Sequence, residues 1–409
     1  DISKLLRGEP NTTVTVAVEQ LLTGERKELK IRRRRITIPS ITYAGYVAEG
    51  VGYIRHADFT DKCYDDMRAA ILRLQSEGEL KSLILDYRNN GGGVLQSAVK
   101  VLSLFVPKGT MVVEMRGRNG ASDKLYTPYE PLLPSIPIVV LINGNSASAA
   151  EIVAGAIQDL DRGVVVGQRS FGKGLVQSTI PLGYNAYAKI TTAKYYIPSG
   201  RCIQAMNYST DGRAEAVADS LISEFKTSRG RKVYDGGGIV PDVKIEPQYV
   251  SRFAVTLYAM GLMEDWADRY MRTHHTDKID VRSFSITDED YADFCRFIAD
   301  KEIPYESETR QALKALERAM ERDRYNESLG EAVEQLKAQL KDDKLSNMQT
   351  YRSEIVDALN SDIVMRHAYN EGVQERIAAT DEEVDRAIEL ILNAEEYQRI
   401  LTSQDVEKR

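Results

Sequence analysis

Two short segments of the sequence contain the residue types of a serine hydrolase that uses lysine as its base. Residues 145–151 include Ser148, and residues 167–177 include Lys173. A serine hydroxyl is a weak nucleophile at neutral pH, and a lysine can activate it only where an apolar site disfavours the ammonium form. Lys173 lies between two glycines in a stretch with few other charges, which favours such a site.

The residues around Ser148 predict a turn from a strand to a helix. Ile138–Ile142 has the pattern of a buried strand, and Ala149–Ile157 has that of a helix packed on it. At such a turn the free N–H groups and the positive end of the helix dipole can stabilise an oxyanion. The alternative is a capping box, in which Ser148 and Glu151 only satisfy N–H groups at the start of the helix.

A third segment reads as a buried strand, Leu83–Asp86, followed by the three glycines Gly91–Gly93 and a helical pattern over residues 96–105. Glycines there let the backbone approach a ligand closely and present N–H groups. An ordinary turn between a strand and a helix explains the pattern equally well. In company with Ser148, we interpret it as the second half of an oxyanion hole.

Residues 167–173 also match half of the phosphate-binding loop of nucleotide-binding proteins. Position 174 is Gly, however, where that loop has the Ser or Thr that holds magnesium. The residues that follow, Leu175–Pro181, look like a strand and not a helix. The hydrolase interpretation is therefore favoured over nucleotide binding.

Taken together, these segments resemble the carboxyl-terminal processing peptidases, also called tail-specific proteases. These are serine-lysine endopeptidases with a crotonase-like core and usually a PDZ domain. The resemblance covers about residues 1–247 and rests on ordered blocks at 52–54, 86–93, 145–151, 169–177, 191–204 and 234–242. Two positions depart from the family pattern: Gly91 stands where the family has proline, and Ala150 where it has serine.

The resemblance implies roles for individual residues. Ser148 matches the nucleophile, Lys173 its base and Gln177 the residue that orients the lysine. The backbone N–H groups of Ala149 and Gly92 would bind the oxyanion, with the choice between Gly92 and Gly93 left open. No metal and no organic cofactor is required.

The implied function is cleavage of flexible, apolar C-terminal tails of proteins in the periplasm or cell envelope of a bacterium. The alternative is a non-catalytic peptide- or ligand-binding protein on the same core fold. Such a protein would be expected to lose Ser148 or Lys173, and both are present.

Composition limits the class of partner. The net charge of −7 provides no basic field for nucleic acid, so a protein or peptide partner is expected. The three cysteines fit no metal-ligand spacing, and the four histidines lie outside the blocks above, which argues against a Ser-His-Asp triad or a histidine metal site. No apolar run reaches the roughly 18 residues of a membrane span, and no signal peptide is visible.

Three regions are expected along the chain. Residues 1–37 resemble the C-terminal part of a PDZ domain, with a helix end and a hairpin. Residues 38–248 alternate strands and helices, the α/β pattern of a layered core that the resemblance makes crotonase-like (the ClpP/crotonase type), with an insertion that contains one short helix near residues 214–225.

The third region, residues 249–409, is expected to be a helical C-terminal domain. Amphipathic helices are predicted at 251–271, 288–301, 306–324, 329–340 and 381–401, the last with a capping box at Thr380 and Glu383. A domain of this kind could form the interface of a homo-oligomer.

Overall fold

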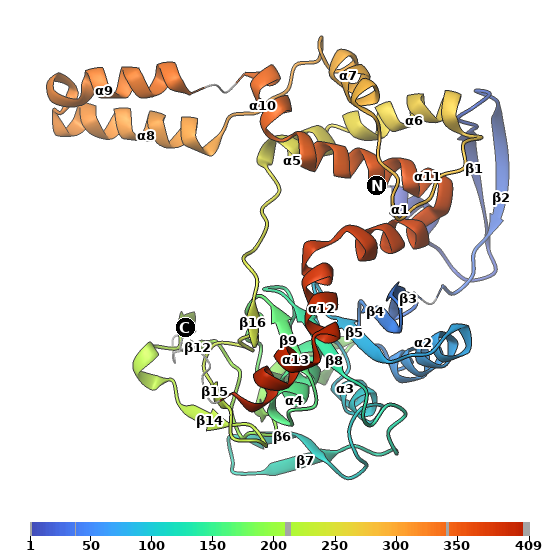
Figure 1. The fold of residues 1–409 in the computed structure, drawn as a ribbon, viewed down its shortest axis with the longest axis vertical. Coiled ribbons are helices and arrows are strands. Elements are labelled where there is room, and N and C mark those ends of the chain that lie inside the picture. Colours follow the sequence, from blue (N-terminus) through green and yellow to red (C-terminus); the bar gives the residue numbers. More distant parts are fainter. Residues whose placement is uncertain (1, 37, 209–213, 341–342, 404–409) are drawn as a thin grey trace. The chain divides into compact units, whose positions relative to one another are not determined.

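The computed structural model of the protein describes residues 2–36, 38–208, 214–340 and 343–403 (Figure 1). The chain folds into two compact units. The core unit consists of Thr37–Pro247 and Ile377–Arg409, and the helical unit consists of Asp1–Ile36 and Gln248–Arg376. No helix among the described residues combines the length and the apolar character that crossing a membrane requires.

A six-stranded sheet forms the centre of the core unit, with the strand order β16-β9-β8-β5-β4-β3. β3 is antiparallel to its neighbour and the other pairs are parallel. Parallel strands bring their carboxyl ends to one edge of the sheet, so the loops that follow β5, β8 and β9 meet there. The strands are β3 (Ile41–Ala48), β4 (Val51–His56), β5 (Ser82–Asp86), β8 (Ile138–Ile142), β9 (Val164–Gly167) and β16 (Val243–Lys244).

Helices cover both faces of this sheet. α2 (Cys63–Glu77), α3 (Leu95–Leu102) and α4 (Ala149–Asp159) pack on one face, together with alternate strand residues such as Leu83 and Leu85. α12 (Glu382–Leu392) and α13 (Ala394–Thr402) pack on the other, where the intervening residue Ile84 points. Burial on both faces explains why these strands read as continuous apolar runs.

A second, antiparallel sheet of the core unit has the order β10-β11-β6-β7. Its strands are β6 (Met111–Gly117), β7 (Ser122–Tyr126), β10 (Leu175–Gly183) and β11 (Ala186–Tyr196). Because β10 begins two residues after Lys173, this sheet fixes the C-terminal end of the lysine loop.

The insertion differs from the prediction of one short helix near residues 214–225. It contains two small hairpins, and the only helical element among its described residues is a single 3-10 turn, Asp219–Leu221. Ala214–Ala216 has helix-forming residues but pairs with Met206–Tyr208, so ladder hydrogen bonds override local propensity. The strands are β12 (Met206–Tyr208), β13 (Ala214–Ala216), β14 (Glu224–Lys226) and β15 (Lys232–Tyr234).

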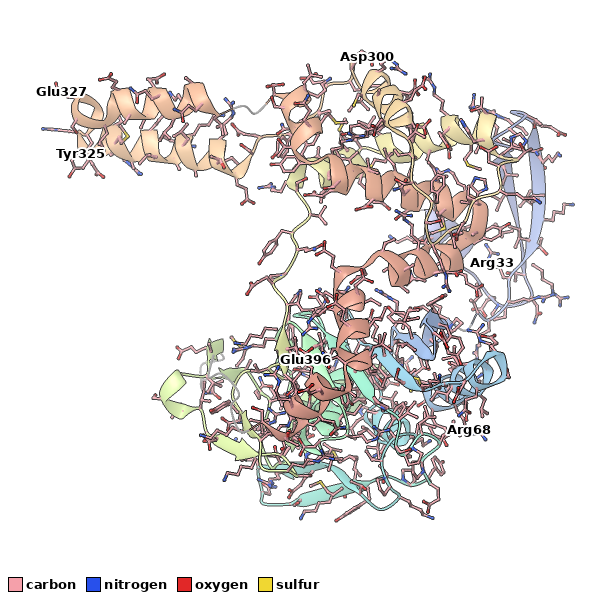
Figure 2. All side chains as sticks on the ribbon, in the orientation of Figure 1. Arg33, Arg68, Asp300, Tyr325, Glu327 and Glu396 are labelled. Atoms are coloured by element: carbon pink, nitrogen blue, oxygen red, sulfur yellow. The ribbon has the colours of Figure 1, made fainter. Side chains whose placement is uncertain are left out.

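The helical unit packs around Trp266, with Phe253, Phe294, Ile355 and Leu359 in the same apolar cluster. α8 and α9 form a hairpin whose tip carries Tyr325 and Glu327 (Figure 2). The elements are α1 (Ile2–Leu6), β1 (Thr13–Glu19), β2 (Arg26–Arg32), α5 (Arg252–Ala259), α6 (Leu262–His274), α7 (Asp288–Phe297), α8 (Glu308–Asp323), α9 (Asn326–Gln339), α10 (Lys344–Thr350) and α11 (Arg352–Thr380).

The predicted helical domain 249–409 is divided between the two units. Residues from Ile377 onward belong to the core unit, because the apolar face of α12, including Val384 and Leu390, covers the sheet face that α2–α4 leave open. Asp381 caps α12 in place of the predicted pair Thr380 and Glu383, since its side chain accepts the N–H groups of Glu383 and Val384.

The hairpin expected within residues 1–37 is present as β1 and β2, and it clusters with the helical unit. The predicted helix 251–271 is two helices, separated at Gly261, whose φ is 72°. Likewise 381–401 is α12 and α13, which meet at Asn393. α10 and α11 were not expected from the sequence.

Candidate active site

Ser148 lies in the turn that joins β8 to α4, as the sequence predicts. Its backbone has φ 57° and ψ −114°, a region of positive φ that residues with side chains rarely adopt. Ser146 holds the turn, because its buried hydroxyl donates to Tyr87 O at 2.8 Å and accepts the Asn143 N–H at 2.9 Å. Ser148 is therefore presented in a strained turn at the start of α4, and Ser146 has a structural role.

The capping box predicted as the alternative for Ser148 is present at the start of α4. The Ser148 N–H donates to Glu151 Oε2 at 2.8 Å, which is one arm of the box. The reciprocal arm pairs the Glu151 N–H with the Ser148 side chain. In this box the Ser148 hydroxyl acts only as an acceptor, so its proton stays available for another acceptor.

The Glu151 carboxylate joins the two segments that carry the candidate nucleophile and base. Glu151 is fully buried. Its Oε2 accepts the N–H groups of Ser148 at 2.8 Å and Lys173 at 2.9 Å. Its Oε1 accepts the Gly172 N–H at 2.7 Å and the Ser170 hydroxyl at 2.5 Å. Burial raises the pKa of Glu151, and the four donors oppose that shift.

The sequence indicates Glu151 only as part of a capping box, so its bridging role is a finding of the structure. A signal for that role was present: Glu151 is an acid near the start of a helix, residues 149–157, whose other members are apolar or Gly. A charged group in such a helix must be paired or hydrogen-bonded, and here its donors come from a loop about 20 residues further along.

Lys173 and Gln177 follow β9 in the chain. The Lys173 side chain is half-buried, and Gln177 in β10 is exposed. Among the residues that the structure describes, no hydrogen bond joins Lys173 Nζ to the Ser148 hydroxyl or to Gln177. The buried Tyr195 hydroxyl connects the loops instead, since it donates to the carbonyl oxygens of Lys173 and, at 3.3 Å, of Ser148.

The structure thus brings the backbones of Ser148 and Lys173 together through Glu151 and Tyr195. The orienting role of Gln177 stays a prediction. After Lys173 the chain enters β10, a strand as predicted, so the half-match to a phosphate-binding loop lacks its helix.

The glycine turn after β5 packs directly on the Ser148 turn. A Cβ added to Gly92, whose φ is +95°, would lie 2.7 Å from Ser148 Cβ and 2.9 Å from Ala149 N. The Ala147 N–H donates to Asn90 O at 2.9 Å, which ties the two turns by a backbone hydrogen bond. Only glycine fits at 92, because any side chain would displace the turn that carries Ser148.

The three candidate oxyanion donors differ in whether their N–H group already has a hydrogen-bond acceptor. The Ala149 N–H at the start of α4 has no hydrogen-bond acceptor among the described residues, as a free donor requires. The Gly92 N–H donates to Asn90 Oδ1 at 2.8 Å and is therefore already bound in this structure. The neighbouring Gly93 N–H, on an exposed residue, has no acceptor within the described ranges.

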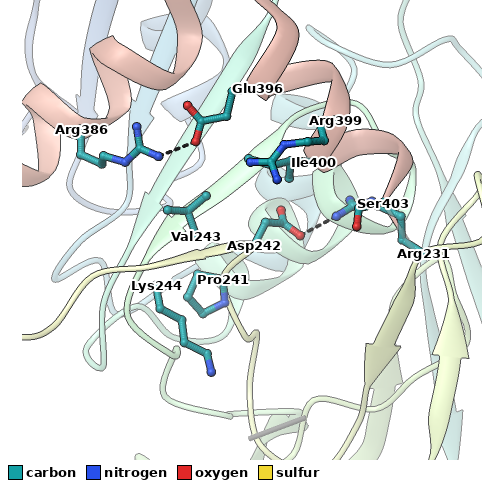
Figure 3. A pocket seen from close by; sticks show the side chains of 10 residues that line it. All are labelled: Arg231, Pro241, Asp242, Val243, Lys244, Arg386, Glu396, Arg399, Ile400 and Ser403. Carbon is teal, nitrogen blue, oxygen red and sulfur yellow. Dashed lines mark hydrogen bonds and ion pairs between the residues drawn. The ribbon is translucent and has the colours of Figure 1, made fainter. Parts of the chain in front are cut away.

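A pocket of about 340 Å³ lies elsewhere in the core unit, between β16 and α13 (Figure 3). Ion pairs join two pairs of its lining residues, Arg386 with Glu396 and Arg231 with Asp242. Neither Ser148 nor Lys173 lines it, so it is separate from the candidate active site.

Comparisons with known proteins identify two segments of the chain. Residues 50–212 match peptidase family S41, and residues 253–391 match the C-terminal helical domain of a probable PDZ-protease. The carboxy-terminal-processing protease of Bartonella bacilliformis is 40% identical over 210 residues, which cover 50% of this chain and 48% of that protein.

Two further proteins are similar. The carboxyl-terminal-processing protease of Synechocystis is 34% identical over 221 residues, covering 53% of this chain and 50% of that protein. The structure of a photosystem II D1 C-terminal processing protease is 28% identical, covers 61% of this chain and 59% of that one, and has a TM-score of 0.41. The chain spans about half the length of the curated relatives it matches. Residues 50–212, which match peptidase family S41, contain Ser148, Lys173 and the glycine turn.

Proposed function

We propose that this protein is a serine endopeptidase that cleaves the C-terminal tails of proteins through a serine-lysine mechanism. The observation that carries the proposal is the buried carboxylate of Glu151, which binds the backbone N–H groups of both Ser148 and Lys173. A hydrolase needs its nucleophile and its base at a fixed separation. Because Glu151 binds both loops, it fixes the separation of the two backbones.

In the proposed reaction the Ser148 hydroxyl attacks the carbonyl carbon of the scissile peptide bond. Neutral Lys173 takes the hydroxyl proton and later gives it to the leaving amine, and Gln177 orients the lysine. Water then hydrolyses the acyl-serine ester. No hydrogen bond joins Ser148 to Lys173 among the described residues, so substrate binding completes their contact in this mechanism.

The developing oxyanion is proposed to bind the Ala149 N–H and a donor of the glycine turn. Ala149 N is supported by its place at the N-terminus of α4, where the helix dipole is positive. The donor named from the sequence is Gly92, whose N–H would have to leave Asn90; the Gly93 N–H needs no such exchange.

The wider setting is proposed from the relatives, whose names state carboxy-terminal processing. The substrates would be flexible, apolar protein tails in the periplasm or cell envelope of a bacterium. A crotonase-like core is supported by the parallel sheet with helices on both faces, and residues 1–37 would be the C-terminal part of a PDZ domain. A homo-oligomer would form through the helical unit.

The test is cleavage of an unfolded protein with an apolar C-terminus at several pH values. Ser148→Ala and Lys173→Ala are compared with Ser76→Ala, a change at an exposed serine of α2. We expect each site variant to lose at least about 10³-fold in rate and the control to match the wild type. Peptide binding without cleavage by the wild type would instead support a non-catalytic binding protein on the same core.

A further inference from the structure

The first turn of α12 lies beside the carboxyl ends of three neighbouring strands of the core sheet. α12 contacts β5, β8 and β9, and it runs next to them in Figure 1. In the sheet β8 stands between the other two, and the chain leaves β8 toward Ser148. The loops that flank the Ser148 turn therefore follow β5 and β9, and both have a polar contact with α12.

The loop after β5 meets α12 through Arg88. Its Nη1 donates to Asp381 Oδ2 at 2.8 Å and to Glu383 Oε2 at 3.0 Å. Its Nη2 donates to Asp86 Oδ2 at 2.7 Å. The Arg88 side chain is only 9% exposed and that of Glu383 15%, so these ion pairs are largely shielded from water. Arg88 immediately precedes the Asn-Asn-Gly-Gly-Gly turn, whose start it fixes.

The loop after β9 meets the same glutamate. Gln168 Nε2 donates to Glu383 Oε1 at 3.0 Å. Gln168 is also anchored to β8, because its N–H donates to Ile142 O at 3.0 Å. Lys173 follows five residues later in this loop. Glu383 Oε2 thus binds the loop that carries the glycine turn, and Glu383 Oε1 binds the loop that carries Lys173.

We propose that Glu383 is a positioning residue that holds these two loops at a fixed separation across the Ser148 turn. A carboxylate suits this task, because it offers two acceptor oxygens, one for a guanidinium and one for an amide. The mutual position of the glycine turn, Ser148 and Lys173 then depends on α12. The effect on cleavage rests on the function proposed above, whereas the effect on the loops does not.

Three variants separate the two contacts. Glu383→Gln keeps the shape but leaves one acceptor oxygen for two donors. Gln168→Leu removes only the contact to the lysine loop. Glu389→Gln is the matched control, because Glu389 is on the same helix, is 71% exposed and, among the residues that the structure describes, forms an ion pair only with Arg386, at 3.6 Å.

The first measurement is amide hydrogen exchange of the intact protein, read by mass spectrometry for residues 87–93 and 168–174. Glu383→Gln should raise exchange in both segments by about tenfold, the equivalent of one charge-assisted hydrogen bond. Gln168→Leu should raise it in 168–174 alone, and Glu389→Gln in neither. Unchanged exchange in both segments of Glu383→Gln would overturn the proposal, and so would an equal rise throughout α12 and the sheet, which indicates general loosening.

The second measurement is peptidase activity, compared under conditions in which the wild type and all variants are equally folded. We expect Glu383→Gln to lower kcat by about 10- to 100-fold while KM changes by less than about threefold, because misplaced loops affect the transition state more than substrate binding. Activity equal to that of Glu389→Gln would refute the positioning role. A wild type that cleaves nothing would end the proposed peptidase function, and the exchange data would still decide whether Glu383 holds the loops.

Discussion

Replacing Glu151 by Gln tests the shared anchor of the candidate active site most directly. The side chain keeps its size but exchanges two acceptor oxygens for one oxygen and one NH₂ group. The carboxylate accepts two donors at each oxygen, from Ser148 and Lys173 at Oε2 and from Gly172 and Ser170 at Oε1. In either orientation of the amide, two donors therefore face the NH₂ group.

The less costly orientation turns the NH₂ group toward Ser170 and Gly172. The Ser170 hydroxyl can rotate, although it also accepts the Ile239 N–H at 2.6 Å. The Gly172 N–H cannot turn away and loses its acceptor. One buried N–H without an acceptor costs about 1–3 kcal/mol, and the two remaining bonds to Ser148 and Lys173 lose their charge assistance, about 1 kcal/mol each.

An opposing contribution reduces this total. Burial raises the pKa of Glu151, so the ionised side chain is itself costly in the folded protein, and the neutral amide removes that cost. We therefore expect a net destabilisation of about 2 kcal/mol, together with a loss of at least about 100-fold in cleavage rate because the loops lose their common anchor.

Urea unfolding gives the free energy, and cleavage of an unfolded protein gives the rate. The control is Glu77→Gln on α2, where the side chain is 49% exposed and lies 3.9 Å from Arg73, so its change should stay within about 0.5 kcal/mol. If Glu151→Gln matches this control in both stability and rate, the carboxylate does not anchor the two loops and the argument fails.

Three further changes test other parts of the core unit. Burial lowers the pKa of His56 to about 4, so it stays neutral when folded but is protonated below its ordinary value of about 6.5 when unfolded. Wild-type stability in urea should hence fall by up to about 3 kcal/mol from pH 6.5 to 4, and His56→Phe should lack that fall. Tyr195→Phe should cost about 1–2 kcal/mol in urea and slow cleavage, because two partly buried carbonyl oxygens lose their donor; unchanged values would contradict this. Arg231→Met should cost about 3–5 kcal/mol by the same measurement, since Asp161 and Asp242 lose a buried partner, and a loss below 1 kcal/mol would exclude it.

Elements that the sequence predicts well are those whose pattern has one explanation. Ile138–Ile142 is apolar at every position because helices cover both faces of the sheet, so it reads as a buried strand. α12 is different. Its apolar face is evident in the sequence, but the pattern does not say whether that face packs on other helices or on a sheet, and the structure places it on the sheet.

The failure to predict α11 from the sequence has a local cause. α11 runs from Arg352 to Thr380, but Ala368 (φ −132°, ψ 15°) and Tyr369 (φ 55°, ψ −163°) interrupt it. The break rotates the second half relative to the first, so no single apolar stripe continues along the segment. A search for one amphipathic period over this stretch therefore fails.

The candidate site divides in a similar way. Ser148 and Lys173 could be predicted from the sequence, because each lies in one of the ordered motifs that carry the family resemblance. Asn90 was overlooked, although its bond to the Gly92 N–H is the local turn, two residues on, that Asn commonly forms. The bonds from Glu151 to Gly172 and Lys173, and from Glu383 to Arg88 and Gln168, join distant parts of the chain, and no local pattern encodes them.

The contacts of Glu151 and Tyr195 with Ser148 and Lys173 act on the backbone and not on the two side chains. Glu151 binds the N–H groups of Ser148 and Lys173, and Tyr195 binds their carbonyl oxygens. Within the described residues, no hydrogen bond joins Ser148 Oγ to Lys173 Nζ. In the proposed mechanism this backbone network fixes the two loops, and substrate binding would complete the contact between the Ser148 and Lys173 side chains. Changes at Glu151 should then lower activity even with Ser148 and Lys173 intact.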